Sequence, residues 1–196
     1  LNLGQIDFDA LRESFQNGRK NIEANKLRGT LNSKLQQMVR LNPTRMDYLE
    51  RLQQLIDDYN AGRGNVDVFF EKLLALMQAL SREEQRGIAE NLSEEELALF
   101  DLLMKPRPEL TKDEVEQVKT AARDLLDTLK AEKLVLDWRK RQQTQAQVEL
   151  TIQDLLDQKL PEAYGTALYE QKCNQVFDHI YKNYYGAGQS IYERVG

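Results

Sequence analysis

Apolar residues recur at intervals of three or four along almost the whole chain. In residues 46–59 the apolar positions follow this spacing, and residues 111–129 repeat it. The spacing places side chains on one face of a helix with 3.6 residues per turn, whereas a half-buried strand alternates every second residue. Such segments bury their apolar surface by packing helix against helix. The sequence therefore predicts an all-α fold, an irregular multi-helix bundle of about eight helices.

The points where helices begin are marked by capping signals. The motif Ser/Thr-x-x-Glu occurs at 81–84, 93–96 and 111–114. In a capping box the hydroxyl and the carboxylate each accept a hydrogen bond from one unpaired backbone N–H of the first turn. We therefore expect the apolar helix at 65–80 to end before two short helices, the second of which ends near Met104. Asn42-Pro43 predicts a further helix start.

Four residues at 105–108, Lys-Pro-Arg-Pro, predict an extended connector. Each proline disfavours the α conformation of the residue before it. We place a subdomain boundary here, with one helical subdomain at 1–105 and a C-terminal helical subdomain at 109–196. We expect a break at 133–138 and an irregular tail after Gly186.

The residues that carry chemistry in enzymes are few in this chain. Cys173 is the single cysteine and His179 the single histidine. We expect Cys173 to be a small core residue and His179 to be a surface or groove residue, because their spacing on a helix turns them to different faces. No P-loop, dinucleotide-type glycine cluster or set of metal ligands is present. The sequence predicts a fragment that is not an enzyme by itself and that holds no cofactor or metal.

The cellular setting is predicted from absences in the sequence. No apolar run is long enough to span a membrane, and no secretory signal precedes the first helix. A single cysteine cannot form an internal disulfide, which favours a cytoplasmic setting. The chain begins at Leu1 rather than at methionine, and we interpret it as a domain cut from a longer polypeptide.

Charge is unevenly distributed along a chain whose net charge is −5. Residues 17–46 carry seven Lys and Arg against Glu23 alone, whereas residues 81–116 carry five basic and eleven acidic residues. Long cationic side chains suit a phosphate backbone. The candidate nucleic-acid-binding residues are Arg19, Lys20, Lys26, Arg28, Lys34 and Arg40. The alternative is a solvated helix whose cations pair with the acidic block at 81–116.

A second candidate surface combines arginine with aromatic residues near the C-terminus. Tryptophan, tyrosine and arginine are the residue types enriched in interface hot spots. The candidate partner-binding residues are Trp138, Arg139, Lys140, Arg141, Tyr184 and Tyr185. A lone tryptophan at the start of a helix is also typical of a core residue. The late tyrosines fit either a half-buried helix or an exposed docking surface.

Residues 134–184 resemble a known family. The stretch reads LVLDWRKRQQTQAQVELTIQDLLDQKLPEAYGTALYEQKCNQVFDHIYKNY, and its most specific pieces are LDWRKRQQ at 136–143, LTIQDLLDQKLPE at 150–162 and YEQKCNQVFDHIY at 169–181. It is similar to the closing segment of the R (motor and endonuclease) subunits of type I restriction-modification enzymes whose C-terminal domain is helical. Residues 1–105 match the upstream helical region of that family only in composition and layout.

The resemblance implies a longer parent subunit with a nuclease domain and two ATP-driven motor domains, an ATP-dependent site-specific deoxyribonuclease that uses ATP and Mg²⁺. None of the family's nuclease or ATPase motifs occurs here, so no catalytic residue is carried over. The implied role is docking the motor onto the methylation and specificity subunits, with other domains of the parent as further partners. The alternatives are a helical domain of the same motor that contacts double-stranded DNA, and an unrelated helical adaptor.

Overall fold

The structure is a computed structural model that describes residues 3–194. Its described part contains eight α-helices and one short two-stranded hairpin, so the all-α fold class is confirmed. The chain divides into two compact units, residues 1–92 and residues 93–196, which are described separately. None of the helices within residues 3–194 combines the length and the hydropathy needed to cross a bilayer.

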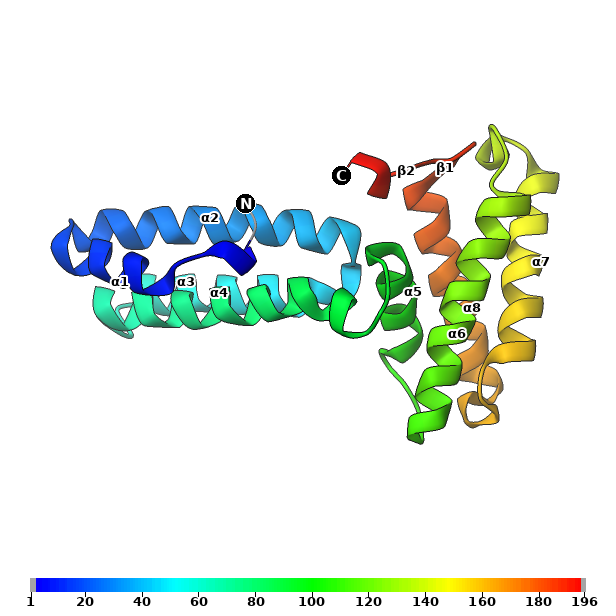
Figure 1. The fold of residues 1–196 in the computed structure, drawn as a ribbon, viewed down its shortest axis with the longest axis horizontal. Helices are drawn as coiled ribbons and strands as arrows, with labels where there is room; N and C mark the ends of the chain where they lie inside the picture. Colours follow the sequence, from blue (N-terminus) through cyan, green and yellow to red (C-terminus); the bar gives the residue numbers. More distant parts are fainter. Residues whose placement is uncertain (1–2, 195–196) are drawn as a thin grey trace. The chain divides into compact units, whose positions relative to one another are not determined.

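The first unit is built around three long helices. Its elements are a 3-10 turn (Leu3–Gln5), α1 (Phe8–Asn17), α2 (Lys20–Leu41), a 3-10 turn (Pro43–Arg45), α3 (Met46–Asn60) and α4 (Val66–Ala89). Helices α2, α3 and α4 lie side by side, with α3 running opposite to the other two (Figure 1). Helix α2 is continuous through Gly29.

Side-chain caps explain where several of these helices begin. The Asp7 carboxylate accepts hydrogen bonds from the N–H groups of Asp9 and Ala10 at the start of α1. Asn42 accepts one from the Thr44 N–H, as its position before Pro43 predicts, and Asn65 accepts one from the Val68 N–H at the start of α4. Each cap satisfies a donor that the first turn of a helix leaves unpaired.

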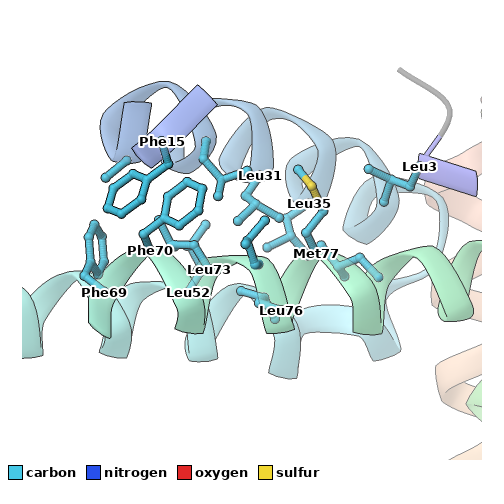
Figure 2. Close-up of a cluster of buried hydrophobic side chains, with 14 of the residues drawn as sticks. Leu3, Phe15, Leu31, Leu35, Leu52, Phe69, Phe70, Leu73, Leu76 and Met77 are labelled. Atoms are coloured by element: carbon cyan, nitrogen blue, oxygen red, sulfur yellow. The ribbon is translucent and has the colours of Figure 1, made fainter. Parts of the chain in front are cut away.

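The core of the first unit consists of aliphatic and aromatic side chains from all of its helices (Figure 2). The rings of Phe15 on α1 and Phe70 on α4 are stacked with centroids 3.8 Å apart, and Tyr59 stacks on Phe69 at 4.3 Å. Leu31, Leu35, Leu52, Leu73 and Leu74 are at most 1% exposed. Each fully buried side chain of this size stabilises the fold by about 1.5–3 kcal/mol relative to leaving it in water.

The prediction of a helix start at 81–84 was wrong, because α4 continues through these residues to Ala89. Ser81 and Glu84 bind the N-terminal segment instead of capping a helix. The Ser81 hydroxyl donates to the Leu3 carbonyl at 3.3 Å, and the Leu3 N–H donates to Glu84 at 2.9 Å. Glu84 also forms an ion pair with Lys34 of α2.

The second unit is a four-helix arrangement of α5 (Glu94–Met104), α6 (Lys112–Thr128), α7 (Gln142–Lys159) and α8 (Gly165–Asn183). Successive helices pack against each other, and α8 packs back against α5 (Figure 1). A π-helical turn (Leu129–Lys133) and a 3-10 turn (Trp138–Lys140) link α6 to α7, and a 3-10 turn (Glu162–Tyr164) precedes α8. The capping boxes at Ser93–Glu96 and Thr111–Glu114 are both confirmed.

The division between the units lies at Leu92/Ser93, whereas the sequence suggested 105–108. Helix α5 packs on α6 and α8 and therefore belongs to the second unit. The Lys-Pro-Arg-Pro segment lies inside that unit, as the link between α5 and α6.

The tail after α8 is more ordered than the sequence predicted. Strands β1 (Tyr184–Gly186) and β2 (Gln189–Ser190) form an antiparallel hairpin, and a 3-10 turn (Tyr192–Arg194) follows. Ala187 and Gly188 turn the chain with φ of 52° and 80°. The expectation of an irregular tail was therefore wrong for this hairpin.

Candidate functional site

The candidate partner-binding residues come together where the α6–α7 link meets the end of α8 and the hairpin. Trp138 is fully buried at this point. Its Nε1–H donates to the Tyr184 carbonyl at 3.1 Å, and its ring meets the edge of the Tyr181 ring at 5.8 Å between centroids. Trp138 is thus a core residue that holds the link against α8, and it offers no surface to a partner. Of the two interpretations of Trp138, the structure supports the core residue and not the partner-binding one.

Gly186 explains how closely the hairpin approaches this link. Its φ is +95°, and a Cβ at this position would lie 2.2 Å from the Val135 carbonyl oxygen and 3.0 Å from the Trp138 ring. The next residue, Ala187, donates its N–H to the Leu134 carbonyl at 2.8 Å. Only glycine fits both the conformation and the space. The hairpin therefore contacts the link on one side, and the buried Trp138 ring holds the link against α8.

Arg139 lies between two tyrosine rings and the end of α8. Its guanidinium carbon is 4.7 Å from the Tyr185 ring centroid and 5.8 Å from that of Tyr181, within the range of cation–π attraction. Its Nη1 donates to the Tyr181 carbonyl at 3.1 Å. This carbonyl is in the last turn of the helix, where a positive charge is favoured by the helix dipole. The position of Arg139 is consequently fixed by three separate contacts.

Part of the link and the adjoining Tyr181 of α8 are open to solvent. Leu136 is 71% exposed, Val135 47% and Tyr181 39%, and Lys140 and Arg141 are exposed as well. Lys140 pairs with Asp137 at 2.8 Å. The hydrogen bond from Lys140, together with the nearby charge of Arg141, lowers the pKa of Asp137 below its ordinary value. We define the Arg139 face as Val135, Leu136, Arg139, Lys140, Arg141 and Tyr181.

Behind this face lies a buried polar cluster. Tyr184 is 2% exposed and donates its hydroxyl to Glu95 of α5 at 3.0 Å, where Lys130 also pairs with Glu95. Burial raises the pKa of Tyr184 far above its ordinary value, so the phenol stays neutral and donates. Its burial places Tyr184 inside the unit, while Tyr185 is half-buried beside Arg139.

His179 belongs to the same cluster, and the expectation that it is a surface or groove residue was wrong. It is 4% exposed. Burial lowers its pKa to about 4, with a smaller effect from the charge of Lys182. The Asn183 amide lies 3.0 Å from Nδ1, and the Tyr192 hydroxyl lies 3.1 Å from Nε2. Because the amide is a donor, Nδ1 accepts, and the neutral ring carries its proton on Nε2. Cys173 is buried, as expected.

The candidate nucleic-acid-binding residues do not form one surface in the first unit. Lys20 pairs with Asp67 at 2.5 Å, Lys26 with Glu23 at 2.8 Å, and Lys34 with Glu84. Arg19 and Arg40 are exposed and Arg28 is half-buried. At about 100° per residue, Lys20 and Arg40 point about 200° apart around α2, and so do Lys26 and Arg28. The pairing of Lys34 with Glu84 favours the alternative of ion pairs with the acidic block.

Two buried residues that hold the end of α5 were not among the candidate site residues. Lys172 is fully buried and donates to the Leu102 carbonyl at 2.7 Å, and Tyr164 donates to the Leu103 carbonyl at 3.0 Å. Both satisfy carbonyls of the last turn of α5, which has no partners within the helix. Burial lowers the pKa of Lys172 to about 8. The sequence signal for such a buried role is that Lys172 lies among the apolar positions of its helix.

Within residues 3–194, no group of three or more His, Cys, Asp and Glu side chains is arranged to hold a metal ion. The buried polar side chains described above bind each other and backbone carbonyls. Together these contacts hold the Arg139 face in place on the helices of the second unit.

Comparison with known proteins gives the family of the chain. The model of the family "Type I restriction enzyme HindI endonuclease subunit-like, C-terminal" matches residues 1–184. A protein of Methanocaldococcus jannaschii with the provisional name type I restriction enzyme MjaIXP endonuclease subunit is 30% identical over 130 residues. The match covers 64% of this chain and 12% of that protein, so the chain corresponds to a small part of the relative's length. No solved structure matches the chain significantly.

Proposed function

The chain belongs to the family of C-terminal regions of type I restriction enzyme endonuclease subunits, and from this premise we propose that it docks the subunit onto its methyltransferase–specificity core. The parent subunit moves along DNA and cuts it with ATP and Mg²⁺ through other domains. This helical region supplies the attachment.

The Arg139 face is the single observation that carries the proposal. It combines exposed aliphatic side chains with a tyrosine and two arginines, and tyrosine and arginine are residue types enriched in protein interfaces. Its supporting residues are buried and hydrogen-bonded, so binding would cost little ordering of the surface. The face also lies inside the segment 134–184, within the part of the chain that the family model covers.

A role without catalysis accords with the chemistry of the described residues. The single histidine is buried and neutral at physiological pH, and the single cysteine is buried. Within residues 3–194, His179 forms hydrogen bonds with Asn183 and Tyr192 rather than with Cys173. We therefore assign ATP hydrolysis and DNA cleavage to the parent's other domains.

Contact with duplex DNA is the less supported role. A phosphate-binding surface needs several cations on one side, whereas the basic residues of α2 are distributed around the helix and Lys20, Lys26 and Lys34 are engaged in ion pairs.

The test is a binding experiment between the 196-residue chain and the purified methyltransferase–specificity core. We expect the chain to sediment with the core and to displace the intact endonuclease subunit when added in excess. ATP should neither be required nor be hydrolysed. If the intact subunit assembles on the core but the chain neither binds nor competes at micromolar concentration, the docking function lies elsewhere in the parent.

A further inference from the structure

The Arg139 face has the features of a preformed anchor rather than of an ordinary surface loop. Among the described residues of the second unit, the exposed large apolar side chains are Val135, Leu136, Leu150 and Tyr181, and three of these belong to the face. Leu136 is the most exposed of them. Isolated exposed leucines are common, but a cluster of apolar side chains beside basic residues marks an interaction site.

The backbone that presents Leu136 is held on both sides. The Trp138 N–H donates to the Val135 carbonyl at 3.2 Å, and the Leu134 N–H donates to the Leu129 carbonyl at 2.9 Å. Asp137 completes the turn in the left-handed conformation, with φ of 58°. The fixed backbone reduces the entropy that a partner must overcome to bind the leucine.

The charges around Leu136 are predominantly positive. Residues 135–141 contain three cations and one carboxylate, Asp137. Arg139 contacts a carbonyl and two rings, and in the described part of the chain no acidic side chain forms an ion pair with it. Its remaining N–H groups, together with Lys140 and Arg141, favour carboxylates on whatever binds there.

From these observations we infer that the Arg139 face binds a protein surface on which carboxylates surround an apolar pocket that receives Leu136. This inference rests on the proposed docking function and names the chemistry of the partner. Complementary charge steers the two surfaces together, and burial of Leu136 with Val135 and Tyr181 supplies the apolar contact. The face offers a nucleic acid cations and one ring, Tyr181, but its exposed aliphatic side chains, Val135 and Leu136, are buried better by an apolar protein surface.

Two kinds of variant separate the apolar anchor from the charges, measured as the Kd of the intact endonuclease subunit for the methyltransferase–specificity core. We expect Leu136→Asp to raise the Kd by about tenfold or more, as for a central interface residue. Leu136→Ala should raise it less. The double variant Lys140→Glu/Arg141→Glu should raise it about tenfold at about 50 mM salt and markedly less at about 500 mM, because salt screens the charges.

Matched controls lie in the same unit. Leu150→Asp changes another leucine that is 56% exposed, on α7, and Lys105→Glu/Lys112→Glu reverses two exposed cations outside the face. Neither control should change the Kd more than about twofold, an effect within the usual range of surface substitutions. Far-ultraviolet circular dichroism checks that all variants keep their helices.

The outcomes distinguish this inference from the function on which it rests. If the wild-type chain binds the core but the face variants bind as tightly as their controls, docking stands and the inference is overturned. Assembly unchanged, with weaker binding of a labelled DNA duplex or single strand by Lys140→Glu/Arg141→Glu, makes the face a nucleic-acid site and also overturns it. Self-association that is lost in Leu136→Asp would identify a second copy as the partner, against the inference.

Discussion

The two units bury their polar side chains in different ways. In residues 1–92 the buried charge of Arg45 faces the carboxylate of Glu83 at 2.9 Å, and Lys20 and Lys34 pair with acids on α4. In residues 93–196 the buried donors Lys172, Trp138 and Tyr164 reach backbone carbonyls. In the first unit the buried charge is thus paired with another side chain. In the second unit these buried donors reach the ends of helices and the link between them, while ion pairs such as Lys159 with Asp124 also join its helices.

The difference has a physical consequence for substitutions. An ion pair near the surface contributes about 0–1 kcal/mol and weakens with salt. A buried donor that is removed leaves a carbonyl unsatisfied, at a cost of about 1–3 kcal/mol that salt does not relieve. We therefore expect changes to the exposed pairs of the first unit, such as Lys20 with Asp67, to be tolerated better than changes to the buried donors of the second, where they would disturb the Arg139 face.

The largest effect is expected from Trp138. Trp138→Ala should lower the free energy of unfolding by about 3–5 kcal/mol, the range found when large buried rings are truncated. Trp138→Phe keeps a ring but leaves the Tyr184 carbonyl without its donor, and should cost about 1–3 kcal/mol. Urea unfolding followed by circular dichroism measures both.

The matched change in the first unit is Leu35→Met, at a fully buried position of α2. A swap of similar volume in an apolar core usually costs less than about 1.5 kcal/mol. If Trp138→Phe proves no more costly than Leu35→Met, the proposed contrast between the units does not hold.

The next effect depends on pH and concerns His179. Its pKa in the folded protein is about 4, below its ordinary value of 6.5, because burial opposes the charge. As pH falls below 6.5, His179 becomes protonated in the unfolded chain, whereas in the folded protein it stays neutral down to about pH 4. The stabilising contribution of neutral His179 is complete above pH 6.5 and is lost between pH 6.5 and pH 4. A pKa difference of about 2.5 corresponds to about 3 kcal/mol.

The comparison that isolates this contribution is wild type against His179→Gln. Glutamine can still donate and accept hydrogen bonds but does not titrate. Between pH 7 and pH 4 the wild type should lose up to about 3 kcal/mol more unfolding free energy than the variant. Carboxylates elsewhere titrate in both proteins and cancel in the difference. Parallel curves for the two proteins would show that His179 is more solvated than its burial indicates.

Much of the helical fold was predictable because its signals are local. The capping boxes at 93–96 and 111–114 are made by residues three positions apart, and both form as predicted. The same motif at 81–84 failed because Glu84 has distant partners, the Leu3 N–H and Lys34, which stabilise a continuous helix. A local pattern cannot report a competing contact that comes from another part of the chain.

The contacts behind the candidate site could not be predicted for a further reason. Lys172, Trp138 and Tyr164 donate to backbone carbonyls, and every residue has a carbonyl. The sequence therefore marks one partner of each contact but not the other. Arg139, Lys140 and Arg141 were candidates because their charge is visible in the sequence. The burial of Trp138 beneath them became evident only once Gly186 and the hairpin were placed.

The smallest predicted effect compares two tyrosine hydroxyls, one in each unit. Tyr164 is 4% exposed and donates to the Leu103 carbonyl at 3.0 Å, and burial raises its pKa to about 12, so it remains a donor throughout the neutral range. Tyr59 donates to the Asn21 side chain at 3.3 Å near solvent.

Tyr164→Phe should lower the unfolding free energy by about 1–2 kcal/mol, whereas Tyr59→Phe should stay within about 0.5 kcal/mol, because water can replace its partner. Urea unfolding at two salt concentrations measures both, and the Tyr164 difference should not change with salt because no ion pair is involved. Equal costs for the two variants would mean that water also reaches the end of α5, and the second unit would then be no more dependent on its buried donors than the first.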